Sequence, residues 1–433
     1  MRRIAFHKDL LQGLVPPLGR RAWRLLAGQA LSQLGTGLTY PILLLYLHQA
    51  RGIDLAAAGF VLATTSAAGL LALPLAGAFI DRVGAGRALV LALLICGAGT
   101  GGFALVRRPA EAFLAAALYG AGVAGMWNAL STLFARVVPP RFRGSVFGVN
   151  YALQNLGFGI GAGLGGLVLE ARSPRSFQLL FTADAASFLL FAAILVLSGE
   201  LRRAANEPGS PGPEAPVVSP GTSTGYRAVL RDRALLAFAG LNTLLSAASF
   251  SQLNSAFPAW ATGPVGVSPR VVGTAFLANT LVIVVAQLFV LHYLLRGRRR
   301  TRATAAAALL FGTAWVFALT AGAVSGSRSA EAVLIASLMV FGFGETLLSP
   351  SLPALVNDLA PEELRGRYNA VYSLSWNLGP IIGPVVAGQT LARGWGAAHF
   401  AGLAVACALA AGAAVWAERL VPDRVNRGGH FTE

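Results

Sequence analysis

The sequence predicts an all-α integral membrane protein with twelve transmembrane helices in two pseudo-symmetric six-helix bundles. The first observation behind this prediction is composition. The 433 residues are 55% hydrophobic and 12% charged, and the charged fraction is about half that of an ordinary soluble protein. The charges are clustered, and twelve windows of at least 19 residues lie between the clusters. A helix of about 20 residues crosses the hydrocarbon of a bilayer, so each window is expected to be a spanning helix.

The second observation is an internal repeat. Residues 143–166 and 365–388 share their spacing of arginine, asparagine, leucine and glycine, and the two copies lie 222 positions apart. An offset of half the chain predicts two related halves. We expect an N-terminal bundle at 1–199, a cytoplasmic Pro/Gly-rich linker at 200–233, and a C-terminal bundle with a short cytoplasmic tail at 234–433.

The twelve predicted spans follow from the absence of charge within them. Ten contain no Asp, Glu, Lys or Arg, and two contain one acid each, Asp184 and Glu345. In chain order they are 25–50, 55–80, 88–106, 112–135, 144–169, 176–199, 234–269, 271–295, 303–327, 332–357, 368–392 and 394–417.

The net charge of +16 is explained by topology. With the N-terminus inside, the inner loops and tails hold 26 of the 34 Lys and Arg residues, and the outer loops hold 8. This asymmetry predicts that both termini are cytoplasmic, and no nucleic-acid partner is expected. The Ala, Gly and Arg bias is typical of a GC-rich bacterial genome, which places the chain in a bacterial cell (inner) membrane.

The repeated segment carries glycines at four-residue spacing, which let two helices approach closely. Pro384 in the second copy removes a backbone donor and creates a flexible point. The asparagines that recur in both copies, Asn155 and Asn377, are expected to bond between helices. The motif residues are Gly148, Gly157, Gly161, Gly165 and Gly166 in the first copy, and Gly379, Gly383, Pro384 and Gly388 in the second.

This pattern resembles the antiporter motif of the drug:proton antiporters (multidrug efflux proteins) of the major facilitator superfamily. Ala162 replaces the family's proline on span five, whereas span eleven carries it as Pro384. The loop between spans two and three resembles the superfamily signature G-x-x-x-D-R-x-G-R. The resemblance implies a gating latch between this loop and the start of span eleven, near residues 364–367. The loop residues are Gly77, Asp81, Arg82, Gly84 and Arg87. The equivalent loop of the second half, residues 296–300, keeps its arginines but lacks the acid.

Glu345 is the leading candidate for proton coupling. A charge at the bilayer centre costs about 2.5–3.5 kcal/mol or more unless it meets water or a partner, and no Lys or Arg lies mid-span in this chain. Glu345 is therefore expected to be protonated much of the time and able to carry a proton. Asp184 is the second candidate, as a relay or as a structural group bonded to Ser187. The arginine that many relatives carry on span four is absent, which excludes coupling through it.

Polar and aromatic side chains on apolar spans are candidate walls of a substrate cavity. The resemblance implies a central cavity lined by spans one, four, seven, ten and eleven. The candidates are Gln33, Trp127, Asn128, Tyr151, Asn254, Tyr372 and Trp376. The five histidines lie near span ends or in tails and are expected to be exposed.

These features predict a secondary active transporter that exports amphiphilic organic compounds, drug-like or endogenous, by alternating access in exchange for protons. The partners expected are a small organic substrate, protons and the lipid bilayer, and the protein is expected to be monomeric. The sequence contains no P-loop, metal-ligand cluster or nucleophile–base arrangement, so no catalysis, cofactor or metal is expected. The alternatives are an importer of a small nutrient or metabolite and a non-transporting membrane protein.

Overall fold

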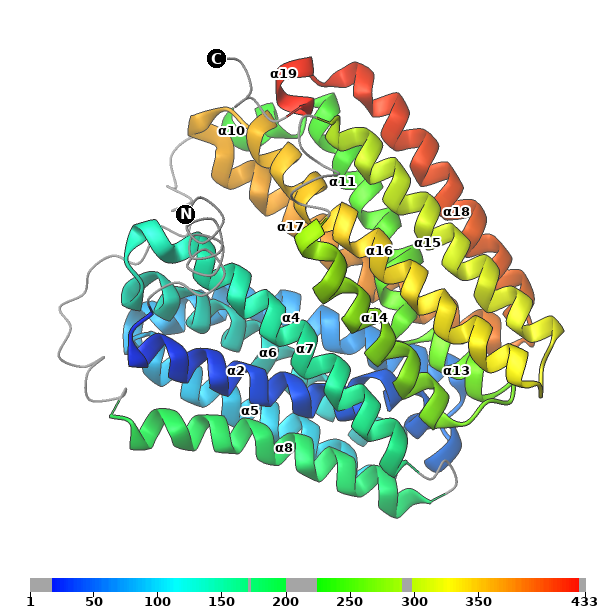
Figure 1. Ribbon diagram of the computed structural model, residues 1–433. Helices are drawn as coiled ribbons and strands as arrows, with labels where there is room; N and C mark the ends of the chain where they lie inside the picture. The colour runs from blue at the N-terminus through cyan, green and yellow to red at the C-terminus, as the bar shows by residue number, and fades with distance from the viewer. Residues whose placement is uncertain (1–17, 170–172, 200–223, 290–297, 428–433) are drawn as a thin grey trace, which may run out of the picture. The chain divides into compact units, whose positions relative to one another are not determined.

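A computed structural model describes residues 18–169, 173–199, 224–289 and 298–427, which form helices and turns with no strand (Figure 1). The predicted all-helical fold is confirmed. The tail at 1–17 and most of the predicted linker, at 200–223, lie outside the described residues. Residues 224–229 of that linker form a helix rather than a flexible connection, and the Asp232 side chain caps the helix that follows by accepting from the Ala234 N–H at 2.8 Å.

The first six spans run from α2 to α8. Span one is interrupted where Pro41 removes a backbone donor, and it continues through a 3₁₀ turn and a π-helical turn. The elements are α2 (Arg20–Thr39), η1 (Tyr40–Ile42), α3 (Leu43–Leu45), η2 (Tyr46–Ala50), α4 (Leu55–Val83), α5 (Ala85–Leu105), α6 (Pro109–Val137), η3 (Pro140–Phe142), α7 (Arg143–Val168) and α8 (Pro174–Leu197).

The last six spans follow α10, and span seven is interrupted like span one. It contains a π-helical turn and then a break at residues 254–255. The elements are α10 (Thr224–Val229), α11 (Arg233–Leu245), η4 (Ser246–Phe250), α12 (Ser251–Leu253), α13 (Ala256–Thr262), α14 (Pro269–Phe289), α15 (Arg300–Ala323), α16 (Arg328–Leu359), η6 (Glu362–Leu364), α17 (Arg365–Ala392), α18 (Gly396–Trp416), η7 (Ala417–Leu420) and α19 (Asp423–Asn426).

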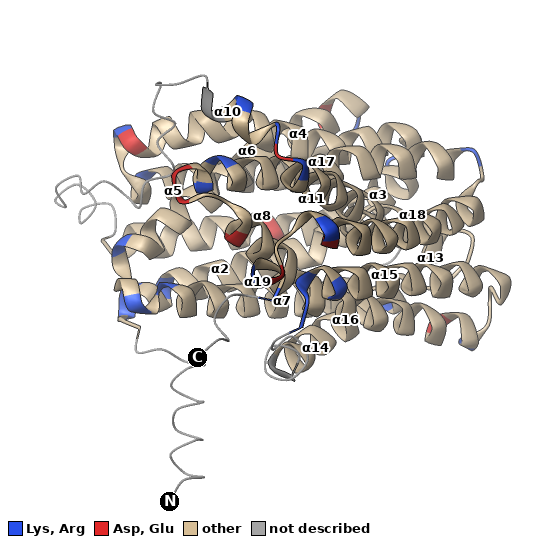
Figure 2. Ribbon diagram, turned by 90° about the horizontal axis from the view of Figure 1, so that it is seen from above, with Lys and Arg blue, Asp and Glu red and all other residues tan. Residues whose placement is uncertain are grey.

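Ten of the described spans are long and apolar enough to cross a membrane by length and hydropathy. The other two predicted spans form α7 and α17, which have 26 and 28 residues. These two helices carry the glycine motif, and their glycine and polar residues lower their mean hydropathy. Figure 2 shows most charged residues at helix ends and in turns, which fits helices whose middle sections lie in lipid. The described residues thus include twelve spans, as predicted.

Packing divides the chain into two compact units. The first unit comprises Met1–Thr39, Ala67–Gly165 and Pro174–Glu214, and the second comprises Tyr40–Ser66, Gly166–Ser173 and Ala215–Glu433. The second unit therefore takes in one end of spans one, two and five. The predicted boundaries at 199 and 234 concern the sequence-related halves and stay a prediction.

Each unit has a closely packed interior. In the first, α8 packs against α2 and α5 (Figure 1), and a methyl group at Gly99 of α5 would lie 2.5 Å from the backbone nitrogen of Tyr119 on α6. In the second, α15 packs between α16 and α18. Its Trp315 is fully buried and donates from Nε1 to the Ala248 carbonyl at 2.8 Å. Such close contacts hold the polar groups described below in defined positions.

Candidate functional site

The carboxyl group of Glu345 is buried within the second unit, at 8% exposure. It lies in the middle of α16, a helix whose start is capped by the Ser327 side chain, which accepts from the Ala330 N–H. Its hydrogen-bond partner is Asn279 of α14, whose Nδ2 lies 3.4 Å from Glu345 Oε1. The same amide nitrogen donates to the Leu338 carbonyl at 3.0 Å. Asn279 therefore bridges the backbone of α16 to its carboxyl group.

Two glycines beside Glu345 let the neighbouring helices approach α16. A methyl group at Gly342 would lie 3.0 Å from the Asn279 carbonyl oxygen, and one at Gly344 would lie 2.6 Å from the Phe311 ring. Glu345 is thus enclosed by α14 on one side and an aromatic side chain of α15 on the other. Among the described residues no Lys, Arg or His forms an ion pair with it.

Asn279 is missing from the sequence-based set of site residues. The signal for it was an amide side chain well inside the charge-free window 271–295, which also contains Gln287. An amide at that depth needs a partner, and Glu345 is the acidic residue available in the second half's spans.

Asp184 forms a second buried carboxyl site, in the first unit, at 1% exposure. Thr39 Oγ1 at the end of α2 donates to Asp184 Oδ2 at 2.6 Å. Ser187, the predicted local partner, donates from Oγ to the Asp184 backbone carbonyl at 2.7 Å, and its hydroxyl group also lies beside the Asp184 carboxyl group. Gly35 of α2 makes room for this cluster, since a methyl group there would lie 2.6 Å from Asp184 Oδ1.

Replacing Thr39 with Val is expected to destabilise the first unit, because the buried Asp184 carboxyl group would lose the hydrogen bond from the Thr39 hydroxyl group. The loss is expected to be about 1–3 kcal/mol, the cost of a buried unsatisfied group. Thermal unfolding of the purified protein in detergent measures it. Thr39→Ser keeps the hydroxyl group and is the matched control. Equal melting temperatures for the Val and Ser variants would show that this hydrogen bond contributes nothing.

The glycine motif of α7 packs against α2 in the first unit. A methyl group at Gly157 would lie 2.7 Å from the Ala30 carbonyl oxygen, and one at Gly165 would lie 2.8 Å from that of Leu38. Between them, a methyl group at Gly161 would overlap the Leu34 carbonyl oxygen. The four-residue repeats of the two helices are therefore in register. Gly148 has open space around it, and Gly166 belongs to the second unit, where it packs on Pro269.

The copy on α17 packs against span seven in the second unit. Methyl groups at Gly379 and Gly383 would overlap the Ser246 and Ser251 side chains, respectively. A methyl group at Gly388 would lie 2.5 Å from the Leu55 carbonyl oxygen. The interhelical bond predicted for Asn377 is wrong among the described residues: its Nδ2 donates to Ser373 O of the same helix at 2.8 Å. Asn155 makes the same bond to Tyr151 O at 2.9 Å.

The loop signature lies where α4 ends and α5 begins. Gly84 has φ +85°, a conformation that favours glycine, and its carbonyl accepts from the Ala88 N–H at the start of α5. Asp81, Arg82 and Arg87 are exposed. Residues 364–367, the implied latch partner, belong to the other compact unit, and the latch stays a prediction.

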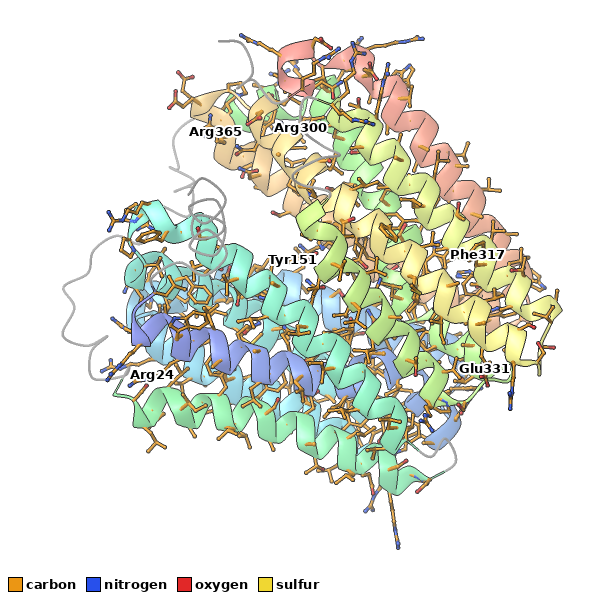
Figure 3. All side chains as sticks on the ribbon, in the orientation of Figure 1. Arg24, Tyr151, Arg300, Phe317, Glu331 and Arg365 are labelled. Atoms are coloured by element: carbon orange, nitrogen blue, oxygen red, sulfur yellow. The ribbon has the colours of Figure 1, made fainter. Side chains whose placement is uncertain are left out.

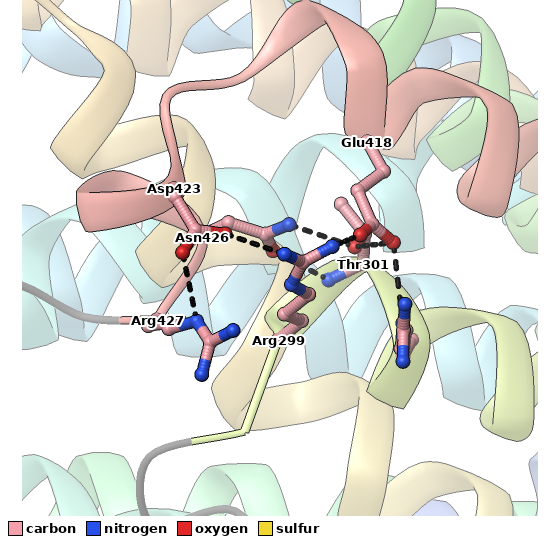
Figure 4. A network of polar contacts seen from close by, with 7 residues as sticks. Arg299, Thr301, Glu418, Asp423, Asn426 and Arg427 are labelled. Atoms are coloured by element: carbon pink, nitrogen blue, oxygen red, sulfur yellow. Dashed lines mark hydrogen bonds and ion pairs between the residues drawn. The ribbon is translucent and has the colours of Figure 1, made fainter.

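In the equivalent loop of the second half, and at the start of α15, the arginines form ion pairs with acids from distant parts of the chain. Arg299 pairs with Glu418 and, at 2.9 Å, with Asp423, both in the segment after α18 (Figure 4). Arg300 pairs with Asp358 at the end of α16, at 2.6 Å. The buried Asn426 side chain accepts from the Thr301 N–H at 3.0 Å and so caps α15. The missing acid in the loop is thus replaced by carboxylates of α16 and the C-terminal segment.

The predicted cavity residues are divided between the two units. In the first, Gln33 and Asn128 are half-buried, and Trp127 and Tyr151 are 36% and 37% exposed. Tyr151 lies on α7 (Figure 3). In the second unit the residues are Asn254, Tyr372 and Trp376, all of intermediate burial.

Trp376 in the second unit lies in a cluster of aromatic side chains. The Trp376 ring centroid lies 4.8 Å from that of Phe250, which in turn contacts Phe311 and Phe341. Asn254 Oδ1 is buried with no hydrogen-bond partner among the described residues. Such a group is available to a ligand or water.

An apolar pocket of about 470 Å³ lies in the first unit and is separate from these residues. None of the predicted cavity residues lines it. Its walls come from α4, α5 and α6, with Arg82 of the loop signature among them.

His399 departs from the exposure expected for the histidines. It is 6% exposed and hydrogen-bonded to Gln252 and Thr390, whereas His48 is exposed as expected. The other three histidines lie outside the described residues.

Comparison with known proteins identifies the family. The sequence model of the Major Facilitator Superfamily matches residues 25–251 and 239–431. The chain belongs to this superfamily and is a multi-pass membrane transporter. Members of this superfamily are generally transporters.

Relatives and solved structures agree with this assignment. The chain is 27% identical to the uncharacterized MFS-type transporter YdeE of Escherichia coli, over 86% of this chain and 89% of the relative. It is 26% identical to a Na(+), Li(+), K(+)/H(+) antiporter of Planococcus maritimus, with the same coverage, and 24% identical to multidrug resistance protein 1 of Bacillus subtilis, over 84% and 88%. A solved POT family transporter in complex with 5-aminolevulinic acid matches at a TM-score of 0.75 and 15% identity, over 93% of this chain and 97% of that one.

Proposed function

We propose that this transporter exports amphiphilic organic compounds in exchange for protons. The observation that carries the proposal is the buried Glu345 carboxyl group, which has one long hydrogen bond from Asn279 and no ion pair among the described residues. The similarity to multidrug resistance protein 1 and to a cation/proton antiporter supports both parts of the proposal, the organic substrate and the exchange.

Glu345 would carry the proton. When one of its oxygens binds a proton from water on one side of the membrane, the group becomes neutral and tolerates a dry environment. When that proton leaves to water on the other side, the carboxylate needs water, the Asn279 amide or a cationic substrate. Alternating access of the two bundles would supply the change of environment between these steps.

The substrate class is inferred from the side chains available to bind it. Trp127, Trp376, Tyr151 and Tyr372 would provide aromatic surface, and Gln33, Asn128 and Asn254 would provide amides. Apolar walls with a few polar groups suit amphiphilic molecules of varied shape. A cationic substrate would also be attracted to the Glu345 carboxylate and to aromatic faces.

Purified protein in proteoliposomes tests the exchange. An imposed pH gradient is expected to drive a fluorescent lipophilic cation such as ethidium toward the acidic compartment, and collapsing the gradient is expected to stop the movement. Movement that is insensitive to the gradient would overturn proton exchange. Movement toward the alkaline compartment would indicate the alternative, an importer.

Asp81→Asn is expected to slow the transport cycle and leave substrate binding mostly intact, since the proposed latch acts between conformations and not on the substrate. The maximal transport rate is expected to fall by about tenfold, which corresponds to about 1.4 kcal/mol in the barrier. Equilibrium binding of ethidium and transport rates measure the two effects. Loss of binding together with a normal cycling rate would contradict the latch.

A second candidate function is the exchange of alkali cations for protons. It is favoured by the similarity to the Planococcus maritimus antiporter and by the oxygen groups of Asp184 and Thr39 at the break in span one. Carboxylate, hydroxyl and carbonyl oxygens are ligands for hard cations. A pH change inside proteoliposomes on adding NaCl, without any organic compound, distinguishes this function from drug export.

A further inference from the structure

A buried polar network around His399 joins three helices of the second unit. His399, near the start of α18, places Nε2 3.1 Å from Gln252 Oε1 on α12. Its Nδ1 lies 2.9 Å from Thr390 Oγ1 on α17. Both ring nitrogens of the buried His399 side chain therefore have a hydrogen-bond partner.

The surroundings of Gln252 determine which ring nitrogen carries a hydrogen. Gln252 Nε2 donates to the carbonyl oxygens of Ala247 at 2.7 Å and Gly383 at 3.4 Å. Both partners are acceptors, so the amide orientation is determined, and Oε1 is left facing His399. An amide oxygen only accepts, hence His399 Nε2 must donate.

The other ring nitrogen has two possible states. Thr390 has one hydroxyl hydrogen, and Oγ1 lies 2.8 Å from Val386 O, 3.0 Å from Ala387 O and 2.9 Å from His399 Nδ1. In the neutral imidazole, Nδ1 accepts the Thr390 hydrogen. In the imidazolium, Nδ1 donates to Thr390, and the hydroxyl group donates back to the carbonyls of its own helix.

The network spans the flexible point of α17. Gln252 holds the Gly383 carbonyl directly before Pro384, and Thr390 lies six residues after Pro384. Ser251 packs against Gly383 at the same level. His399 thus connects α18 to α17 in two places. Through Gln252 it connects to Gly383 just before Pro384, and through Thr390 it connects to α17 after Pro384, the residue at which α17 lacks a backbone hydrogen bond.

The described segments that face His399 offer no carboxylate to balance an imidazolium charge in this packing. The Arg393 guanidinium at the end of α17 donates to Gln389 O and lies 5.7 Å from the Trp395 ring centroid. The facing residues 246–262 and 311–323 contain no acid, base, Tyr, Cys or further His. Cys407 lies two turns along α18 and contacts Ser249.

Two acids at helix starts in the same unit have other partners or are exposed. Asp54 accepts from the Ala56 and Ala57 N–H groups at the start of α4. Glu331 is exposed in the first turn of α16, beside exposed Arg328. A buried imidazolium without a carboxylate is costly, so proton binding favours an arrangement in which His399 reaches water.

We propose that His399 is a proton-binding positioning residue that couples acidification to release of α18 from the Gly383–Pro384 segment of α17. The exposed Arg393–Trp395 turn lies one helical turn before His399, and release of α18 would bring the imidazole toward this surface. Imidazole gains its charge within the range of about pH 5–8. Proton binding at His399 is independent of Glu345 and of the proposed drug export.

Hydrogen–deuterium exchange of the full-length protein in lipid nanodiscs tests this inference without a substrate. Between about pH 7.5 and pH 5.5, exchange of peptides covering residues 383–400 is expected to rise after correction for intrinsic rates. If release takes up one proton, the opening constant rises by up to about tenfold for each pH unit. His399→Gln retains a donor for Gln252 but cannot become charged, so its exchange is expected to be independent of pH.

Matched variants make the result decisive. Thr390→Val removes the oxygen to which Nδ1 of the packed imidazolium would donate and is expected to steepen the response, whereas Thr390→Ser and the exposed-histidine control His48→Gln are expected to keep it at the wild-type level. A pH response that persists in His399→Gln, or one that is lost in His48→Gln, would overturn the proposal. A flat wild-type profile would also overturn it.

Discussion

Glu345→Gln is expected to abolish proton-driven transport while the protein still inserts and folds. Glutamine has nearly the same size and can still accept from Asn279, but it cannot bind and release a proton. The movement of ethidium driven by an imposed pH gradient should fall to the level of empty vesicles, a loss of at least about a hundredfold, or about 2.7 kcal/mol. Melting temperature and expression should stay close to those of the wild type.

Glu331→Gln is the matched control for this experiment. It changes the same chemical group on the same helix, but Glu331 is exposed in the first turn of α16. It should leave gradient-driven transport unchanged. If Glu345→Gln transports at the wild-type rate, Glu345 has no part in coupling, and Asp184 becomes the remaining mid-span acid to test.

Gly161→Ala is expected to have the second large effect, on stability. The added methyl group would overlap the Leu34 carbonyl oxygen of α2, and a backbone carbonyl in a packed helix cannot move aside cheaply. Overpacking of this kind costs about 1–3 kcal/mol. The expected result is a clearly lower melting temperature in detergent and less folded protein, with Gly161→Leu worse still.

Two other glycines provide comparisons for Gly161→Ala. Gly148→Ala on the same helix meets nothing within 4 Å and should be neutral or slightly stabilising. Gly383→Ala overlaps the Ser251 hydroxyl group, which can rotate, but its methyl group would also lie 2.7 Å from Ser251 Cβ and 2.9 Å from the Ala247 carbonyl oxygen, so it should be clearly more destabilising than Gly148→Ala. Equal melting temperatures for all three variants would mean that the glycine spacing does not serve helix packing.

The membrane class, the helical fold and the twelve spans could be predicted from sequence because they depend on local composition. A charge-free window of this length forms a spanning helix whatever segments it packs against, because its backbone groups must form hydrogen bonds within the helix in lipid. The same holds for Glu345, whose position in such a window is visible along the chain. Hydropathy alone would have missed α7 and α17, and the absence of charge from windows 144–169 and 368–392 was the signal that identified them.

Partners from distant segments could not be predicted. Thr39 and Asp184 are 145 residues apart, and Gln252 and His399 are 147 residues apart, so only packing brings them together. His399 lies three residues inside a helix end, where an exposed side chain is the ordinary expectation. The carboxylates that pair with Arg299 come from the C-terminal segment, and no local pattern indicates that pairing.

The π-helical turn at residues 246–250 has a consequence for comparing this chain with its relatives. Such a turn holds one residue more than an α-helical turn, and one residue corresponds to a rotation of about 100°. The wider turn absorbs this extra residue, so a relative whose span seven is α-helical throughout can have one residue fewer here and still keep the later residues on the same face. Sequence alignments should therefore allow a one-residue gap at residues 246–250. Chimeric proteins joined within this turn should keep its number of residues unchanged.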